Sequence, residues 1–173
     1  YRQELLVVAQ GHEEICGVHV DKIKPRVLQW LIVSHHESRY LVAHLHGIWI
    51  EGNTKGDDPM RDDQSREVRY LLDQLMLRYD VDHIIFGGDL NLAIETKALQ
   101  LLVDGPGSDL SFRSLVTEFG ISSTRTPEYR EFGTPGKEHA DYVLVSPQVD
   151  VRLFEVDTSQ YASDHAPLLL RVS

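Results

Sequence analysis

The sequence contains a single cysteine, Cys16, among 173 residues. One cysteine excludes an internal disulfide framework and is typical of a reducing compartment, so we expect a cytoplasmic location. Apolar runs of membrane-spanning length are also missing, and residues 41–50 show why, because His44 and His46 interrupt an otherwise apolar stretch. The sequence therefore predicts no membrane span.

Basic residues are scarce, since 17 Lys and Arg stand against 27 Asp and Glu and the formal net charge is -10. Such a chain does not attract polyanions by its bulk charge. If it handles phosphates, it must do so at a local site, most simply one that holds a divalent metal. The length and a hydrophobic content of 42% predict one well-packed domain over residues 1–173, with no internal repeat or linker.

Apolar runs and helical periodicity alternate along the chain. Apolar runs predict strands over residues 4–9, 15–20, 27–34, 40–45, 83–87, 142–145, 149–156 and 168–172. Helical spacing predicts helices over residues 57–79, 97–103 and 109–119, the first capped by Asp58 with Pro59 at its first position. Residues 121–138 form a polar loop, where substrate groups tend to sit. The alternation predicts an α/β domain built on buried sheets.

Two short motifs place carboxylates beside other polar groups near predicted strands. The first is Gly87-Gly88-Asp89-Leu90-Asn91, which follows the apolar run of residues 83–86. In extended chain Asp89 and Asn91 project to the same side, because they lie two residues apart. The second motif runs from Ser163 to Pro167 and sets Asp164 beside His165. Either motif alone is compatible with a polar turn, but the two together favour an active site at strand ends.

These motifs, in this order, resemble those of the endonuclease/exonuclease/phosphatase superfamily. Residues 139–146, His-Ala-Asp-Tyr-Val-Leu-Val-Ser, resemble a third motif of that family, and residues 41–46 resemble its Asn-x-His strand. His46 takes the histidine position of that strand, and His44 stands where asparagine is usual. Arg61-x-x-Gln64 is similar to the Arg-x-x-Gln of many members. The resemblance extends over residues 27–173.

The resemblance implies a fold, an activity and a cofactor. The fold is a four-layer αββα sandwich of the deoxyribonuclease type. The activity is that of a divalent-metal-dependent phosphoesterase that hydrolyses a phosphodiester or a phosphomonoester, as a nuclease or a small-molecule phosphatase. The implied cofactor is Mg²⁺ or Mn²⁺, and nucleic acid is one possible substrate. The acidic net charge weakly favours a small phosphoester over tight binding of duplex DNA.

Five residues take catalytic roles by this resemblance and by their chemistry. Asp89 orients or deprotonates the attacking water, and Asn91 donates its amide to a phosphoryl oxygen. His165 contacts the phosphate as a donor when protonated, or acts as a base when neutral. Asp141 pairs with this histidine and favours its charged form. His46 donates to the phosphate from the opposite side.

The expected metal ligands are Asp164, Asp89 and Asn91, since hard oxygen ligands suit Mg²⁺ and Mn²⁺. The two histidines His44 and His46 on one strand face leave open a zinc site, although no cluster of Cys and His completes a tetrahedral set.

The family pattern is incomplete at the start of the chain. A strand that ends in Gln-Glu, whose glutamate is a principal metal ligand in the family, is not recognisable, because Gln3-Glu4 precedes an apolar run instead of following one. We therefore expect a domain that lacks its N-terminal portion and that hydrolyses phosphodiesters poorly by itself. The alternative is a non-catalytic family member or fragment that acts as a binding module.

Three assignments concern residues outside the motifs. Arg125, Tyr129 and Arg130 in the polar loop either grip a substrate phosphate or belong to a solvated loop. Trp30 and Trp49 are expected in the core rather than as platforms for base stacking, although Trp49 follows His46 closely enough to line a cleft.

Overall fold

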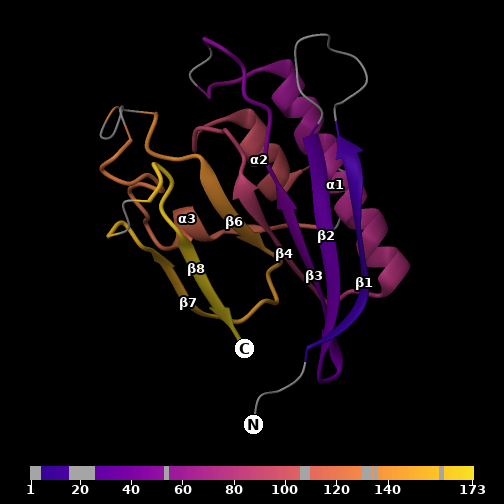
Figure 1. Ribbon diagram of the computed structural model, residues 1–173. Coiled ribbons are helices and arrows are strands. Elements are labelled where there is room, and N and C mark those ends of the chain that lie inside the picture. Colours follow the sequence, from indigo (N-terminus) through magenta and orange to yellow (C-terminus); the bar gives the residue numbers. More distant parts are fainter. Residues whose placement is uncertain are drawn as a thin grey trace.

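The computed structural model describes residues 5–15, 26–52, 55–105, 110–129, 134, 136–159 and 162–173. Two sheets and three helices form the described part of the chain (Figure 1). The six-stranded sheet has the order β1-β2-β3-β4-β6-β5, and β7 pairs with β8 in a second sheet. The elements in chain order are β1 (Leu6–Ile15), β2 (Arg26–His35), β3 (Ser38–Leu45), α1 (Pro59–Tyr79), β4 (His83–Asp89), α2 (Lys97–Asp104), β5 (Arg113–Ser114), α3 (Leu115–Glu118), β6 (Asp141–Val145), β7 (Val151–Val156) and β8 (Leu168–Val172). The predicted α/β class is confirmed.

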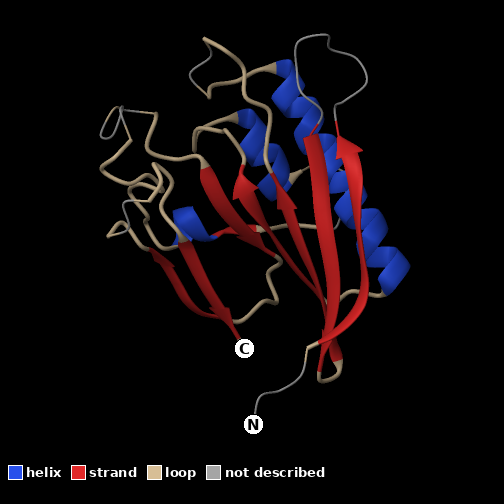
Figure 2. Ribbon diagram, viewed as in Figure 1, coloured by secondary structure: helices blue, strands red, loops and turns tan. Residues whose placement is uncertain are grey.

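Three successive layers follow from the alternation of side chains along the strands. Helices α1 and α2 cover one face of the six-stranded sheet (Figure 2). The strand residues that point to this face are buried: Leu28, Trp30, Ile32, Leu41, Ala43, Leu45, Ile84 and Phe86. The pair β7–β8 reaches the opposite face, where the Tyr40 hydroxyl donates to the Ser173 carbonyl at 3.3 Å. The order helices, large sheet, small sheet corresponds to three layers of the expected sandwich.

Helix α1 begins and ends where its sequence predicts. The Asp58 carboxylate accepts a hydrogen bond from the Met60 backbone N–H at 2.9 Å, and Pro59 occupies the first helical position. These residues satisfy or remove donors that a helix start leaves open. The helix ends at Tyr79, and Asp80 adopts a left-handed conformation with φ of 52°. Helix α2 is likewise capped at its start, where the Thr96 hydroxyl accepts a hydrogen bond from the Leu99 N–H.

Two predictions about local structure are wrong. The predicted helix over residues 109–119 is reduced to α3, because Arg113 and Ser114 instead pair with the edge of β6 and Phe112 is buried. Pairing and burial outweigh a weak helical pattern here. The strand predicted at 4–9 does not end there but continues to Ile15 as β1, and residues 16–20 of the strand predicted at 15–20 lie outside the described residues. Gly11 continues that strand because its missing side chain leaves room for the Trp30 ring.

The two tryptophans differ in burial. Trp30 is buried as predicted, but Trp49 is 56% exposed, so its assignment to the core is wrong. Trp49 lies in the loop that follows β3, and within the described part of the chain no helix or sheet packs over its ring. None of the helices in the described ranges is long and apolar enough to cross a membrane.

Candidate functional site

The sheet topology brings the strand ends that carry the motifs to one edge. Strands β3 and β4 run parallel, so both end at the same edge of the sheet. Strand β6 runs antiparallel to β4 and begins where β4 ends. Asp89, the last residue of β4, is therefore paired directly with Asp141, the first residue of β6. Residues paired in this way project to the same face of the sheet, which sets two carboxylates side by side.

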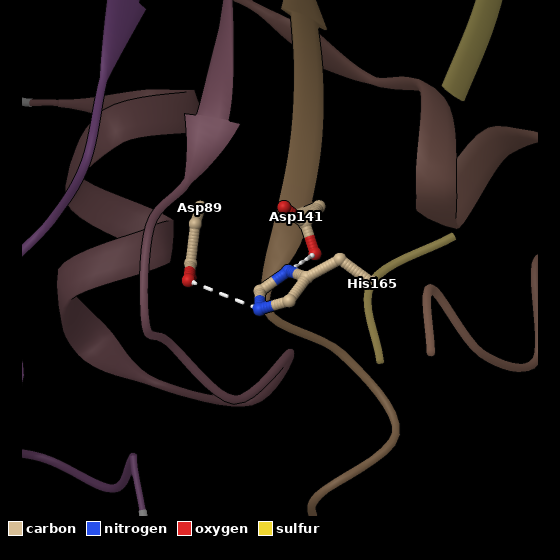
Figure 3. A group of neighbouring side chains, drawn as sticks. All are labelled: Asp89, Asp141 and His165. Atoms are coloured by element: carbon tan, nitrogen blue, oxygen red, sulfur yellow. Dashed lines mark hydrogen bonds and ion pairs between the residues drawn. The ribbon is translucent and has the colours of Figure 1, made fainter. Parts of the chain in front are cut away.

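His165 lies between these two carboxylates (Figure 3). Its Nδ1 is 2.7 Å from Asp141 Oδ2, which is a hydrogen bond, and its Nε2 is 3.7 Å from Asp89 Oδ2. The predicted contact between Asp141 and His165 is confirmed. All three side chains are partly buried, so the interactions among them are less screened than at an open surface.

The carboxylates change the acid–base behaviour of the histidine. The hydrogen bond that the His165 ring donates to Asp141 raises the pKa of His165, and the charges of Asp141 and Asp89 raise it as well, while partial burial and the charge of Arg125 lower it. The net direction is upward, because the neighbouring carboxylates stabilise the imidazolium more than burial destabilises it. His165 therefore keeps its proton to a higher pH than an ordinary histidine. In that state Nε2 is a charged hydrogen-bond donor that faces Asp89.

Backbone hydrogen bonds from the polar loop hold His165 in place. Arg125 forms an isolated bridge with His165, and the Ala166 N–H donates to the Thr124 carbonyl at 3.0 Å. The buried Thr124 hydroxyl also accepts from the N–H groups of Ala140 and Asp141, at 3.1 and 3.3 Å. Thr124 thus connects the segment of His165 to the start of the strand that carries Asp141.

His46 reaches the same place from the end of β3. Its Nε2 lies 3.8 Å from Asp89 Oδ2, and its side chain is 58% exposed. The loop that follows is fixed by two hydrogen bonds, from the Gly47 N–H to the Asp89 carbonyl at 2.7 Å and from the Ile48 N–H to Gln64 Oε1 at 3.1 Å. Gln64 of the Arg-x-x-Gln motif therefore positions the backbone next to His46.

Asn91 is close to the site, but not for the reason that its spacing suggested. Its φ of 53° is left-handed, so residues 89–91 form a turn and the extended geometry expected for Asp89 and Asn91 is wrong. Asp89 Oδ1 accepts from the Asn91 N–H at 3.0 Å, a local contact that favours such turns. The buried Asn91 side chain donates from Nδ2 to the Gly47 carbonyl at 3.4 Å. In this structure its amide supports the turn.

Asp164 lies beside His165 in sequence, yet its carboxylate points to another partner. Asp164 Oδ2 is 3.1 Å from Arg125 Nη1, and the side chain is 49% exposed. The three-residue group that could hold a metal consists of Asp89, Asp141 and His165, and Asp164 is outside it. His44 and His46 belong to no such group within the described residues, so nothing in that part of the chain completes a zinc site for them.

The donor set fits a hard divalent cation that keeps part of its water shell. Ligand atoms of Asp89, Asp141 and His165 lie within 4.8 Å of one another. Mg²⁺ and Mn²⁺ prefer carboxylate oxygens, and Mg²⁺ is commonly held by one or two carboxylates together with water and substrate phosphate. The hydrogen bond between Asp141 and His165 engages one atom of each, which leaves Asp89 as the carboxylate freest to bind a cation.

Lys55 is a charged residue near the site that the sequence motifs do not indicate. It is only 6% exposed, and its Nζ donates to the His139 carbonyl at 2.8 Å, two residues before Asp141. The pKa of Lys55 is lowered to about 8, mainly by burial and also by the charge of Arg125, although the charges of Asp89 and Asp141 act to raise it. A lysine in a glycine-containing polar loop resembles any solvated lysine in sequence, so no local signal marks it.

The polar loop is not simply solvated. Arg125 is 5% exposed, and its guanidinium lies over the Tyr129 ring at 4.5 Å from the ring centre. The alternative of a merely solvated loop is therefore wrong for Arg125. Arg130 lies outside the described residues.

Comparison with known proteins identifies the fold. A scan against models of protein families found no match, and a search of curated proteins found no relative. Solved structures do match, although the sequences are distant. A mannosyl-6-phosphatase from Bacteroides thetaiotaomicron superposes with a TM-score of 0.75 at 16% identity, covering 99% of this chain and 68% of that one.

Two further structures agree with this match. An endonuclease/exonuclease/phosphatase family protein from the same organism has a TM-score of 0.74 at 16% identity, with 99% of this chain and 64% of its own covered. The human Nocturnin catalytic domain has a TM-score of 0.62 at 15% identity, with 98% and 62% covered. The chain thus spans about two thirds of these structures. It has the deoxyribonuclease-type fold of the endonuclease/exonuclease/phosphatase proteins, as the motif resemblance predicts.

Proposed function

We propose that this chain carries the reaction centre of a divalent-metal-dependent phosphoesterase. The observation that supports this most directly is the position of His165, whose ring lies between Asp141 and Asp89 at the end of the sheet. A histidine held by one carboxylate and facing a second is suited to proton transfer and phosphate binding. Similarity of fold to a mannosyl-6-phosphatase and to an endonuclease/exonuclease/phosphatase family protein supports the reaction class and leaves the substrate open.

In the proposed reaction a water molecule attacks the phosphorus atom. Asp89 orients this water and accepts its proton, because it is a carboxylate that faces both His46 and His165 across 3.8 and 3.7 Å. These separations exceed a hydrogen bond. Asp89, His46 and His165 therefore do not hydrogen-bond to one another directly, and a water or a phosphoryl oxygen beside them can bond to them instead.

His165 supplies a positive charge where negative charge develops on the phosphoryl oxygens. Its Nδ1–H is held by Asp141, so Nε2–H is the donor available to the phosphate. His46, more exposed, donates from the other side of Asp89. Asn91 fixes the turn that presents Asp89, and its amide remains a proposed contact for a phosphoryl oxygen.

The proposed metal ligands are Asp89, Asn91 and Asp164. Asp141 adds a second carboxylate close to Asp89. When bound, Mg²⁺ or Mn²⁺ would neutralise charge on the phosphoryl oxygens and assist departure of the leaving oxygen. Asp164 would have to share its carboxylate with Arg125. The single cysteine supports a reducing, cytoplasmic setting for this activity.

The substrate classes are a small phosphomonoester, a phosphodiester or a nucleic acid strand. The mannosyl-6-phosphatase favours the first by analogy, and a structure of D. rerio TDP2 that is complexed with single-strand DNA favours the last. The net charge of -10 supports a small phosphoester over a polyanion.

The test is hydrolysis of p-nitrophenyl phosphate and of bis(p-nitrophenyl) phosphate, with Mg²⁺, Mn²⁺ or EDTA. We expect metal-dependent turnover that is slow in this chain and that both Asp89→Asn and His165→Gln abolish. Asp150→Asn is the matched control, because Asp150 is an exposed carboxylate that precedes β7 and pairs with Arg152 on that strand, away from the site. Chelator-insensitive turnover, or turnover that survives both site substitutions, would refute the mechanism.

The same assays, together with binding measurements, test the alternative that the chain is a binding module. If the chain binds Mn²⁺ and phosphate but hydrolyses neither ester, and if the same holds when any further segment encoded by its gene is included, the protein acts as a binding module. Activity that appears only with such a segment supports a reaction centre that needs an additional ligand.

A further inference from the structure

Two cations lie buried beside the proposed reaction centre. Lys55 is 6% exposed and Arg125 is 5% exposed, which is unusual for residues that normally stay in water. Burying a charge is costly unless it is paired or hydrogen-bonded. The structure must therefore supply a compensating group to each of them.

Their partners within the described residues leave that compensation incomplete. Lys55 Nζ donates to one backbone carbonyl, that of His139, whereas an ammonium has three donors. Arg125 has one carboxylate partner, Asp164, but its Nε is buried and makes no hydrogen bond with any described residue. A buried unsatisfied donor in a polar site commonly marks a missing water or ion. Both cations therefore have donor capacity to spare.

The two cations act on the same small region. Arg125, Asp89 and Asp141 are among the charges that perturb Lys55, and Arg125 and Asp89 are among those that perturb His165. Arg125 also forms the backbone bridge that holds His165, and Lys55 is bonded two residues before Asp141. The N–H of Thr124, the residue before Arg125, donates to the Glu138 carbonyl at 2.9 Å, next to the His139 carbonyl that binds Lys55, so the two cations lie on neighbouring segments. Like charges on neighbouring segments repel each other, and an anion between or beside them would relieve this repulsion.

We propose that Lys55 and Arg125 form an anion subsite that holds the phosphate group of the substrate next to Asp89, Asp141 and His165. The stacking of Arg125 on Tyr129 fixes the guanidinium plane, and a fixed plane favours phosphate recognition. This inference rests on the proposed function for the reaction and names the chemistry of its substrate. Two cations in addition to His165 suit a dianionic phosphate, so the favoured substrate class is a phosphomonoester.

Lys55 and Arg125 are tested first by binding, without turnover. Inorganic phosphate is titrated into the EDTA-treated chain by calorimetry, and we expect saturable one-to-one binding. Loss of one charge-assisted hydrogen bond costs about 1.5–3 kcal/mol, so Lys55→Met and Arg125→Gln should each weaken phosphate binding roughly tenfold to a hundredfold. Lys55→Arg should retain most of the affinity, because it restores the charge. Absence of phosphate binding by the unsubstituted chain would overturn the proposal.

Matched controls remove the same charges elsewhere. Lys97→Met and Arg152→Gln delete exposed cations that pair with Asp62 and Asp150, and both should leave phosphate affinity unchanged. Phosphate affinity that falls equally in the controls would also refute the subsite. If a site variant does not fold, the proposal is tested instead by the NMR chemical shift of Lys55 Cε in the unsubstituted chain. That signal should move when phosphate is added, and an unmoved signal would contradict the proposal.

Turnover separates this inference from the proposed function. If phosphate binding is lost in the two site variants while no ester is hydrolysed, the subsite stands and the enzyme assignment fails. If esters are hydrolysed but both variants keep the phosphate affinity and the KM of the unsubstituted chain, the assignment stands and the subsite is wrong. Support for the monoester class requires a larger loss of kcat/KM on p-nitrophenyl phosphate than on the diester, and an equal loss contradicts it.

Discussion

Asp89 and Asp141 are paired with each other across β4 and β6, so two carboxylates share one position at the end of the sheet. Like charges opposite each other in a sheet are destabilising. His165 lies between them, and protonation of its ring relieves part of the repulsion. The pair therefore favours a positively charged histidine or a cation at this place, and both are useful for binding a phosphate.

The Asp141 carboxylate should control the protonation of His165. Asp141→Asn removes the main cause of the raised pKa, so the pKa of His165 should fall toward its ordinary value of 6.5. The protonated fraction near neutral pH should fall with it. An NMR titration of the histidine ring protons in metal-free protein measures this. Asp150→Asn should leave the His165 titration unchanged, and an equal shift in both variants would show that long-range charge is responsible.

Thr124 should be important for stability beyond its size. Its hydroxyl accepts from the buried N–H of Ala140 and the partly buried N–H of Asp141, and Thr124→Val removes this acceptor from both. We expect a loss of about 1–3 kcal/mol in the free energy of unfolding, measured in urea. Thr124→Ser should recover most of it. Thr117→Val is the control, since Thr117 is exposed and its hydroxyl donates to the Ser114 hydroxyl at 3.3 Å. Equal losses at both positions would contradict the role of Thr124.

Asp89 should matter more than Asp164 for metal binding. Asp89 belongs to the group of three potential ligands, whereas the Asp164 carboxylate pairs with Arg125. Changes outside the ligand set typically weaken metal sites roughly 10- to 100-fold, so Asp89→Asn should cost at least roughly tenfold in Mn²⁺ affinity, and Asp164→Asn less. Titration of Mn²⁺ followed by electron paramagnetic resonance gives both affinities. A larger loss for Asp164→Asn would make Asp164 the principal ligand.

Gly88 should not accept a side chain. Its φ is +135°, and a Cβ atom there would overlap the Leu45 carbonyl oxygen and crowd His44. Gly88→Ala should therefore destabilise the protein by more than the roughly 1–3 kcal/mol that strained backbone alone costs. Gly120→Ala is matched, because Gly120 also has positive φ, +61°, but open space around it. Similar losses in urea denaturation for the two variants would show that contact with Leu45 is unimportant.

Local features of this protein are readable from its sequence because their causes are local. Asp58 and Pro59 start α1 through contacts within one helical turn, and the bounds of β8 follow from a run of five residues of which four are apolar. The motifs around Asp89, Asp141 and His165 indicate the candidate site because the proposed phosphoester hydrolysis would need particular residue types there. The contact of Asp141 with His165 was accessible through the family resemblance.

Other features depend on partners that are distant in the chain. Residues 113–114 extend along β6 instead of continuing a helix, because the edge of that strand offers them hydrogen bonds. The Asn91 side chain is buried where it donates to the carbonyl of Gly47, a residue that is distant in the chain. Lys55 becomes a buried cation only because the loop after β3 folds against the segment before Asp141. The sequence by itself determined which residues can do the chemistry, while the tertiary structure decided which charges share one buried place, since burial and pairing are properties of the packed chain.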